Sequence, residues 1–118
     1  MFEFHGWAVI KSNACLDAAD DDLVRELQRH LTNMTPSMQS CFHLADPLNG
    51  FHCITIAGLR NHYRHEVLGL LTWIASRSRQ SYGIVFVRSD DVAGDKDAFR
   101  IHRLSCGKVE EFSDPFFS

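Results

Sequence analysis

The sequence predicts an α+β fold, a mainly antiparallel sheet of about five to six strands with two helices packed on it. Three observations indicate this class: an alternating N-terminal segment, two stretches with apolar residues at helical spacing, and an unbroken apolar run at residues 84–87. The predicted order is β-α-β-β-α-β-β, with a short strand after it. The 118 residues, 45% of them hydrophobic and 23% charged, are typical of one globular domain spanning residues 1–118.

Residues 2–11 alternate between two kinds of side chain, which predicts a strand with one buried face. The side expected to face the core carries Phe2, Phe4, Gly6, Ala8 and Ile10. Trp7 falls on the opposite side. Either helices cover both faces of the strand or Trp7 is partly exposed.

A first helix is predicted from leucines at helical spacing. The apolar positions are Leu23, Leu27, Leu31 and Met34. Asp20 or Asp21 is the expected N-cap, because a carboxylate suits the positive end of the helix dipole. Thr35 and Pro36 are expected to end the helix.

The middle of the chain predicts a hairpin and a second helix. Residues 41–45 and 51–59 are expected strands, joined by a Pro- and Asn-Gly-containing turn at residues 46–50. The helix is expected from His62 to about Arg77, with Asn61 as its cap. Its apolar stripe consists of Tyr63, Val67, Leu70, Leu71 and Ile74.

Four apolar β-formers at residues 84–87 predict a central strand that is covered on both faces. Residues 98–105 are its expected hairpin partner, a short strand follows at 108–112, and residues 113–118 form a tail. Two exposed phenylalanines in this tail would be costly, so we expect the tail to dock against the body.

Composition excludes several classes of function. A net charge of -3 argues against nucleic-acid binding, although residues 60–79 carry four arginines against one acid. No apolar run approaches the ~20 residues of a membrane span, and the N-terminus lacks the pattern of a signal peptide. These features predict a cytoplasmic protein without a membrane partner. The four cysteines form no C-x-x-C pair and are expected to be buried free thiols.

Seven histidines raise the alternative of a small metal-binding or hydrolytic domain on the second helix. His62 and His65 stand at i, i+3 and Glu66 follows, but the order matches neither H-E-x-x-H nor H-x-x-E-H. A second Cys/His arrangement would need Cys41-Phe42-His43 to face His52-Cys53 across the hairpin. The sequence has no G-x-S-x-G, P-loop or G-x-G-x-x-G motif, so we predict no enzyme, no metal and no cofactor.

Protein recognition is the remaining class. Acidic side chains near the C-terminus could complement a basic partner and accelerate association with it. The first set of expected contacts is Asp90, Asp91, Asp95 and Asp97, and the second is Glu110, Glu111 and Asp114. Aromatic residues such as Trp7, Tyr82 or Phe116 would supply apolar anchors.

Several segments together resemble the immunity protein 7 family of bacterial polymorphic toxin systems. They are Phe4-His5-Gly6-Trp7-Ala8, Asn49-Gly50, Gly58 with Asn61-His62, Ser81-Tyr82-Gly83-Ile84-Val85-Phe86-Val87-Arg88 followed by acids, and Asp114-Pro115-Phe116. The segments occur in the family's order over nearly the whole chain. The H-G-W motif and the S-Y-G block are the most specific pair.

The resemblance implies a single immunity-protein domain, encoded beside a toxin gene, that binds the cognate toxin C-terminal domain in the cytoplasm without doing chemistry. Toxins of such systems, including contact-dependent growth inhibition systems, are often nucleases with basic clefts, which the acidic residues would complement. The matched residues are interpreted as structural, because immunity proteins vary where they contact different toxins. They are His5, Gly6, Trp7, Ser81, Tyr82, Gly83 and Arg88.

Overall fold

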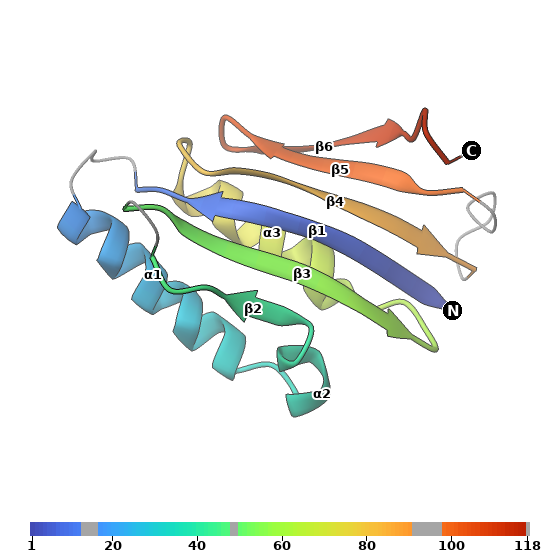
Figure 1. Ribbon diagram of the computed structural model, residues 1–118, viewed down its shortest axis with the longest axis horizontal. Helices are drawn as coiled ribbons and strands as arrows, with labels where there is room; N and C mark the ends of the chain where they lie inside the picture. Colours follow the sequence, from blue (N-terminus) through green and yellow to red (C-terminus); the bar gives the residue numbers. More distant parts are fainter. Residues whose placement is uncertain (13–16, 48–49, 91–97, 118) are drawn as a thin grey trace.

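The computed structural model describes residues 1–12, 17–47, 50–90 and 98–117. Its strands are β1 (Phe2–Ile10), β2 (Phe42–Leu44), β3 (His52–Arg60), β4 (Tyr82–Ser89), β5 (Arg100–Ser105) and β6 (Lys108–Ser113). Its helices are α1 (Asp17–Thr32), α2 (Pro36–Gln39) and α3 (His65–Arg77). The strands form one sheet in the order β2-β3-β1-β4-β5-β6, and every neighbouring pair is antiparallel (Figure 1). The α+β class is confirmed, and the one-turn α2 is an addition to the prediction.

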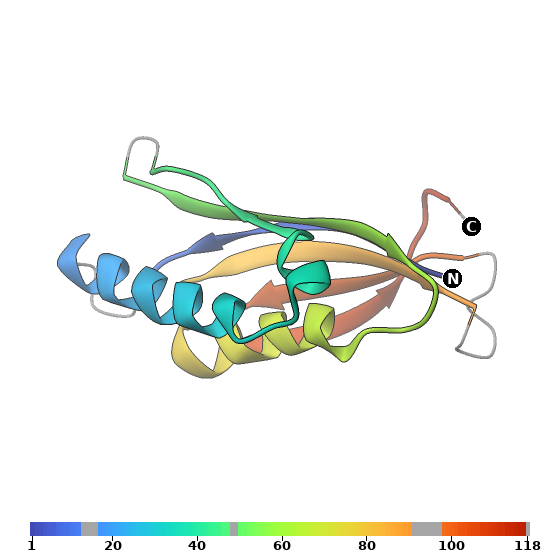
Figure 2. The same cartoon turned by 90° about the horizontal axis from the view of Figure 1, so that it is seen from below.

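The long helices α1 and α3 lie against the same face of the sheet (Figure 2). The core fills the space between the sheet and these helices, and its apolar side chains come from both layers. Fully buried members are Phe2, Phe4, Ile10, Leu27, Met38, Ile54, Ile56, Val67, Leu70, Leu71, Ile74 and Leu104. No helix among the described residues covers the opposite side, which we call the open face.

The alternation of β1 decides which side chains reach the open face. The apolar residues predicted to face the core are buried, apart from the half-buried Gly6. Trp7 is on the open face with 41% of its surface exposed, so the second of the two predicted arrangements is correct. β4 is a central strand, as predicted, but only one of its faces is covered by helices. Ile84 and Phe86 therefore lie half-buried on the open face.

Two glycines allow β1 and β4 to approach closely. A Cβ atom on Gly6 would lie 2.2 Å from the carbonyl oxygen of Ile84, and one on Gly83 would lie 2.3 Å from that of Trp7. Both contacts are with backbone, which cannot turn away as a flexible side chain can. The glycines of the H-G-W and S-Y-G segments are therefore required by the pairing of the two central strands.

The start of α1 differs from the prediction. The helix begins at Asp17, so neither Asp20 nor Asp21 is its cap. The Asp20 carboxylate is buried and accepts a hydrogen bond from the backbone N–H of Ser12 at 2.5 Å, just after β1 ends. The side chain that would suit a cap is thus used in a tertiary contact. At the other end the helix stops at Thr32, and Pro36 opens α2.

The start of α3 was also predicted too early. The helix begins at His65, with Arg64 in an extended conformation at its N-cap. The Tyr63 ring packs on the buried Phe2 ring, with 5.0 Å between centroids. This packing explains why the residues just before His65 are not part of α3. Four predicted stripe residues in α3 are buried: Val67, Leu70, Leu71 and Ile74.

Candidate functional site

The acidic residues predicted to contact a partner occupy different environments. Asp90 follows β4 directly and is exposed, and one of its carboxylate oxygens lies 3.3 Å from the N-terminal amine of Met1. Its backbone N–H also donates to the Met1 carbonyl. Asp91, Asp95 and Asp97 lie outside the described residues. Among the described residues of the first set, Asp90 is therefore accessible to a partner.

The two glutamates of the second set lie on β6, at the edge of the sheet. Glu110 accepts a hydrogen bond from Arg103 at 3.0 Å, and Glu111 forms an ion pair with Arg100 at 3.8 Å. Across the strands, Glu110 stands directly opposite Arg103 and Glu111 directly opposite His102. Their charge is thus partly neutralised within the protein.

Asp114 has a different environment from the other acids. Only 3% of its surface is exposed. One carboxylate oxygen accepts the backbone N–H of Phe116 at 2.8 Å, and the other accepts that of Phe117 at 3.1 Å. A buried carboxylate with both oxygens bound to the backbone fixes a turn. In the free protein the Asp114 carboxylate therefore positions the tail.

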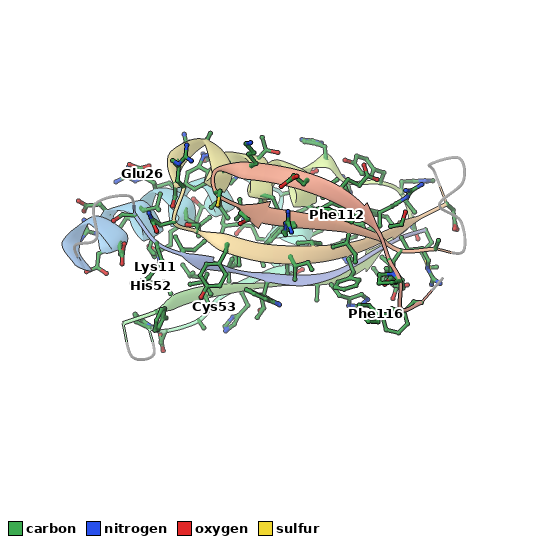
Figure 3. All side chains as sticks on the ribbon, turned by 90° about the horizontal axis from the view of Figure 1, so that it is seen from above. Lys11, Glu26, His52, Cys53, Phe112 and Phe116 are labelled. Carbon is green, nitrogen blue, oxygen red and sulfur yellow. The ribbon has the colours of Figure 1, made fainter. Side chains whose placement is uncertain are left out.

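The turn at Asp114 brings the tail back to the sheet, as predicted. The Phe117 ring makes an edge contact with Phe99 at 5.9 Å between centroids. The phenylalanines nevertheless remain largely exposed, Phe116 by 75% and Phe117 by 68%. Figure 3 places Phe116 on the open-face side, away from Glu26 of α1. The Asp114 turn thus shapes the tail, Phe117 contacts the body of the protein, and Phe116 points to solvent.

The family-matched residues divide into structural and exposed groups. Gly6 and Gly83 serve strand pairing, and the buried hydroxyl of Ser81 accepts the backbone N–H of Lys11 at 3.0 Å. Trp7 and Tyr82, by contrast, are 41% and 44% exposed on the open face. Their rings meet in an edge contact at 6.1 Å. The structural interpretation of the motifs therefore suits the first group better than the second.

Charged side chains at the start of β1 and the end of β4 are paired with one another. Arg88 donates a hydrogen bond to Glu3 at 2.7 Å, and the other carboxylate oxygen of Glu3 lies 2.8 Å from the His5 ring. The hydrogen bond with His5, helped by the charge of Arg88, holds the pKa of Glu3 below its usual value against partial burial. The carboxylate is thus kept ionised and compensated by Arg88.

An apolar groove on the open face was not predicted from the sequence. Its lining residues are His5, Phe86, Phe99 and Phe117, and its volume is about 360 Å³. The Phe99 ring in this groove also packs under the Arg88 guanidinium, whose central carbon lies 5.3 Å from the ring centroid. The apolar run at residues 84–87 contained a signal for this site, since half of that run had to face away from the helices.

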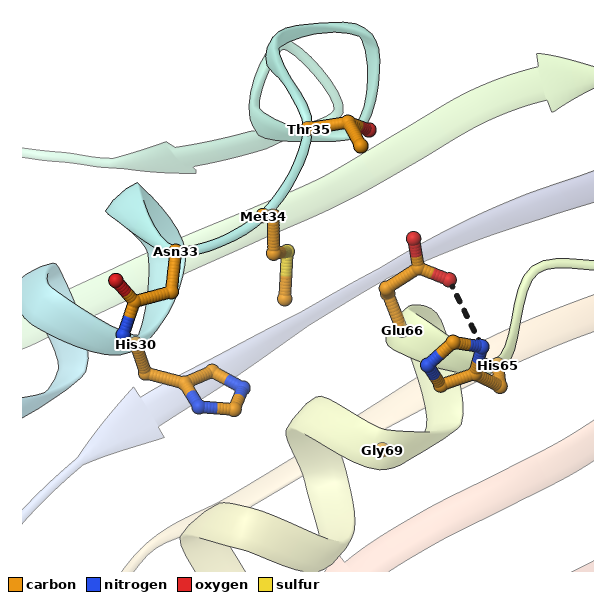
Figure 4. A pocket seen from close by; sticks show the side chains of 7 residues that line it. All are labelled: His30, Asn33, Met34, Thr35, His65, Glu66 and Gly69. Carbon is orange, nitrogen blue, oxygen red and sulfur yellow. Dashed lines mark ion pairs between the residues drawn. The ribbon is translucent and has the colours of Figure 1, made fainter.

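The histidine-rich helix does not form the predicted alternative site. His62 precedes α3, and His65 is exposed. Figure 4 shows His65 and Glu66 on one side of a cleft of about 340 Å³, with His30 of α1 and Asn33, the residue after α1, on the other side. A ring nitrogen of His65 lies 3.2 Å from a carboxylate oxygen of Glu66. Within the described ranges no group of three or more His, Cys, Asp or Glu side chains could hold a metal ion.

The alternative site on the first hairpin is not formed either. Phe42 pairs with Ile56 and His43 with Thr55, so His52 and Cys53 are displaced from the segment they would need to face. Cys41 is buried, where the Arg60 guanidinium donates to its sulfur at 2.8 Å. Cys53 lies on the open-face side (Figure 3).

His30, in the wall of the cleft, is expected to make stability depend on pH. Burial, followed by the charge of Arg77, lowers the pKa of His30. The folded state then binds fewer protons than the unfolded state, whose imidazole has a pKa of about 6.5, so the free energy of unfolding falls as the pH drops through that value. Urea unfolding between pH 7.5 and 5.5 should show a shallower pH dependence for His30→Gln than for the unmodified chain. His43→Gln, which removes an exposed imidazole, is the matched control; equal slopes for both variants would contradict the expectation.

The fold and surface define a small α+β protein with an apolar, aromatic open face. The sequence matches the model of the family described as immunity protein 7 over residues 1–118, and the chain belongs to this family. It is thus an immunity protein directed against a toxin. No curated protein and no solved structure gives a significant match. Among the described helices, none is long and apolar enough to cross a membrane.

Proposed function

We propose that this protein neutralises a cognate bacterial toxin domain by forming a tight, stoichiometric, non-covalent complex with it in the cytoplasm. The observation that carries the proposal is the family match over the whole chain. The open face adds support, because exposed Trp and Tyr side chains are the residue types that most often dominate the binding energy of protein interfaces. The proposed toxin is the C-terminal domain of a polymorphic or contact-dependent inhibition toxin.

A nuclease is the proposed target because this chain carries a net negative charge. Nucleases bind a polyanion and therefore carry basic clefts, to which a chain of net charge -3 is attracted. Asp90 is exposed at the end of β4, and Asp91, Asp95 and Asp97 follow it in the sequence. These four acids are the proposed electrostatic contacts. Glu110 and Glu111 are secondary because arginines of β5 already pair with them.

Growth protection tests the proposed function. The toxin domain encoded immediately upstream is expressed in bacteria with or without this chain, and viable counts are compared. The proposal expects killing by the toxin alone and restored growth, together with a co-purifying complex, when both are present. If a folded toxin of demonstrated activity neither binds this chain nor is neutralised by it, the cognate assignment fails.

Charge reversal tests the proposed contacts. Asp90→Lys combined with Asp91→Lys is expected to slow association about 10-fold at low salt and to reduce its dependence on salt, because long-range attraction sets the encounter rate. Stopped-flow association with the toxin domain measures both. The matched control is Asp22→Lys with Glu26→Lys, which makes the same change in net charge on the exposed side of α1. Equal slowing by both pairs would show that net charge alone is responsible, and unchanged association in the first pair would remove these acids from the interface.

A further inference from the structure

The open face of the sheet carries a continuous apolar band that follows the two central strands, β1 and β4, and ends at Phe99, the residue before β5. Its members, hereafter the open-face band, are Trp7, Val9, Tyr82, Ile84, Phe86 and Phe99. The strand register makes the band continuous, because Val9 stands opposite Tyr82 and Trp7 opposite Ile84. At its end the band runs into the groove formed with His5 and Phe117. A surface of this kind on a small protein typically marks a binding site.

The band is not explained by the packing of the protein itself. The core between the sheet and the helices is complete without it, since Phe2, Phe4 and Ile54 reach zero exposure on the other face. In the part of the tail that the structure describes, Phe117 covers one end of the band, where it meets Phe99. Trp7 and Tyr82 lie beyond the residues that line this tail groove and keep more than two fifths of their surface exposed. Burial of such large rings would provide substantial apolar stabilisation of a complex.

The charges that border the band determine the kind of partner it fits. On one side Arg88 is bound to Glu3, and on the other Arg103 is bound to Glu110. Because these two arginines are paired with acids, they offer less attraction to phosphate groups, which argues against nucleic acid or an anionic membrane as the occupant. The band suits apolar side chains of a protein surface.

The net charge distinguishes a toxin from a second copy of the chain. Two copies, each with a net charge of -3, repel one another, whereas a basic protein is attracted over a Debye length of about 8–10 Å. Strand β4 supplies three members of the band, and the exposed carboxylate of Asp90 follows directly after it. This carboxylate would add to the attraction of a basic partner. The favoured occupant is therefore an apolar cluster set within a basic surface.

We infer that the open-face band is the docking surface for the toxin domain, with Trp7 and Tyr82 as its central anchors and the groove at Phe99 receiving an apolar side chain of the toxin. This inference rests on the proposed function. Apolar burial then provides the affinity of the complex, and the acidic residues accelerate the encounter of the two proteins. Dissociation rates should then respond to changes in the band, and association rates to changes in the acids.

Substitution of the anchors tests the inference quantitatively. Trp7→Ala is expected to raise the Kd for the catalytically inactive toxin domain at least about 30-fold, mainly through faster dissociation. Tyr63→Ala is the matched control, because Tyr63 has the same 41% exposure but packs on Phe2, a core residue. It should leave the Kd within about 3-fold. Circular dichroism and the thermal midpoint establish that each variant is folded. A folded Trp7→Ala variant with unchanged Kd overturns the inference.

A fluorine probe gives a test that leaves Trp7 in place. The chain contains two tryptophans, Trp7 and Trp73, so 5-fluorotryptophan incorporated into Trp73→Phe reports on Trp7 alone by ¹⁹F NMR. The toxin domain is left unlabelled. A changed chemical shift and reduced solvent-isotope effect for Trp7 on binding are expected. If the labelled chain binds the toxin and protects growth but the Trp7 signal does not change, the inference fails while the proposed function stands.

Two other outcomes separate the inference from its competitors. If the unmodified chain does not bind or neutralise an active toxin, the proposed function fails and the inference falls with it. If sedimentation shows a dimer that Trp7→Ala dissociates and toxin binding is unaffected by the substitution, the band is a contact between two copies of this chain. Either result overturns the assignment of the band to the toxin.

Discussion

Gly83→Ala is expected to lower the free energy of unfolding by about 3 kcal/mol, which for a chain of this size corresponds to a fall in the thermal midpoint of about 10 °C. The added methyl would lie 2.3 Å from the Trp7 carbonyl oxygen and 2.7 Å from Ala8 Cα. Both atoms belong to the backbone of β1, so relief requires the two central strands to separate. Chemical denaturation followed by circular dichroism measures the change.

Gly69→Ala is the matched control for this substitution. Gly69 is exposed within α3, and a Cβ there would have no neighbour within 4 Å. Alanine has the higher helix propensity, so the variant should gain roughly 0.5–1 kcal/mol. If Gly83→Ala were as stable as Gly69→Ala, the close approach of β1 and β4 would be wrong.

The second large effect is expected at Phe4, which is fully buried on β1. Phe4→Ala should cost about 3–5 kcal/mol, because the cavity it leaves is bordered by Phe2 at 5.1 Å and by the bare backbone of Gly58. A Cβ on Gly58 would lie 2.6 Å from the tip of the Phe4 ring. The aromatic ring therefore occupies the space that a side chain at position 58 would fill.

A double-mutant cycle tests this contact directly. Gly58→Ala alone should destabilise the protein, but in a Phe4→Ala background the new methyl enters vacated space and should cost less, with the Cys41 sulfur as its remaining close neighbour. Equilibrium unfolding of the four proteins gives the coupling. Additive effects would show that the ring and the glycine are independent.

The fold class was predictable because burial imposes simple periods on the sequence. The alternation of β1 and the stripe of α3 follow from one buried face each, and those faces are where the patterns placed them. The helix starts were not predictable, because tertiary contacts decide them. Tyr63 packs on Phe2 and keeps its segment out of α3, and Asp20 binds the end of β1 instead of capping α1.

The candidate site was predictable only in part. The acids were visible in the composition, but burial and pairing depend on strand register and on the tail turn. Neither the pairing of Glu110 with Arg103 nor the burial of Asp114 could be deduced from local sequence. The open face was partly visible, because alternation already placed Trp7 opposite the core. The apolar run of β4 is predicted from its sequence to be covered on both faces. The run's residues on the uncovered face, Ile84 and Phe86, belong to the open-face band.

The central claim is that this protein neutralises its toxin by direct binding. Calorimetric titration of the purified chain into the folded, catalytically inactive toxin domain tests it most directly. We expect one site per toxin, a Kd in the nanomolar range or below, and a negative heat-capacity change from burial of the apolar band. A folded toxin domain whose active form kills cells, but which releases no binding heat at several temperatures and forms no complex by sedimentation, would contradict the account.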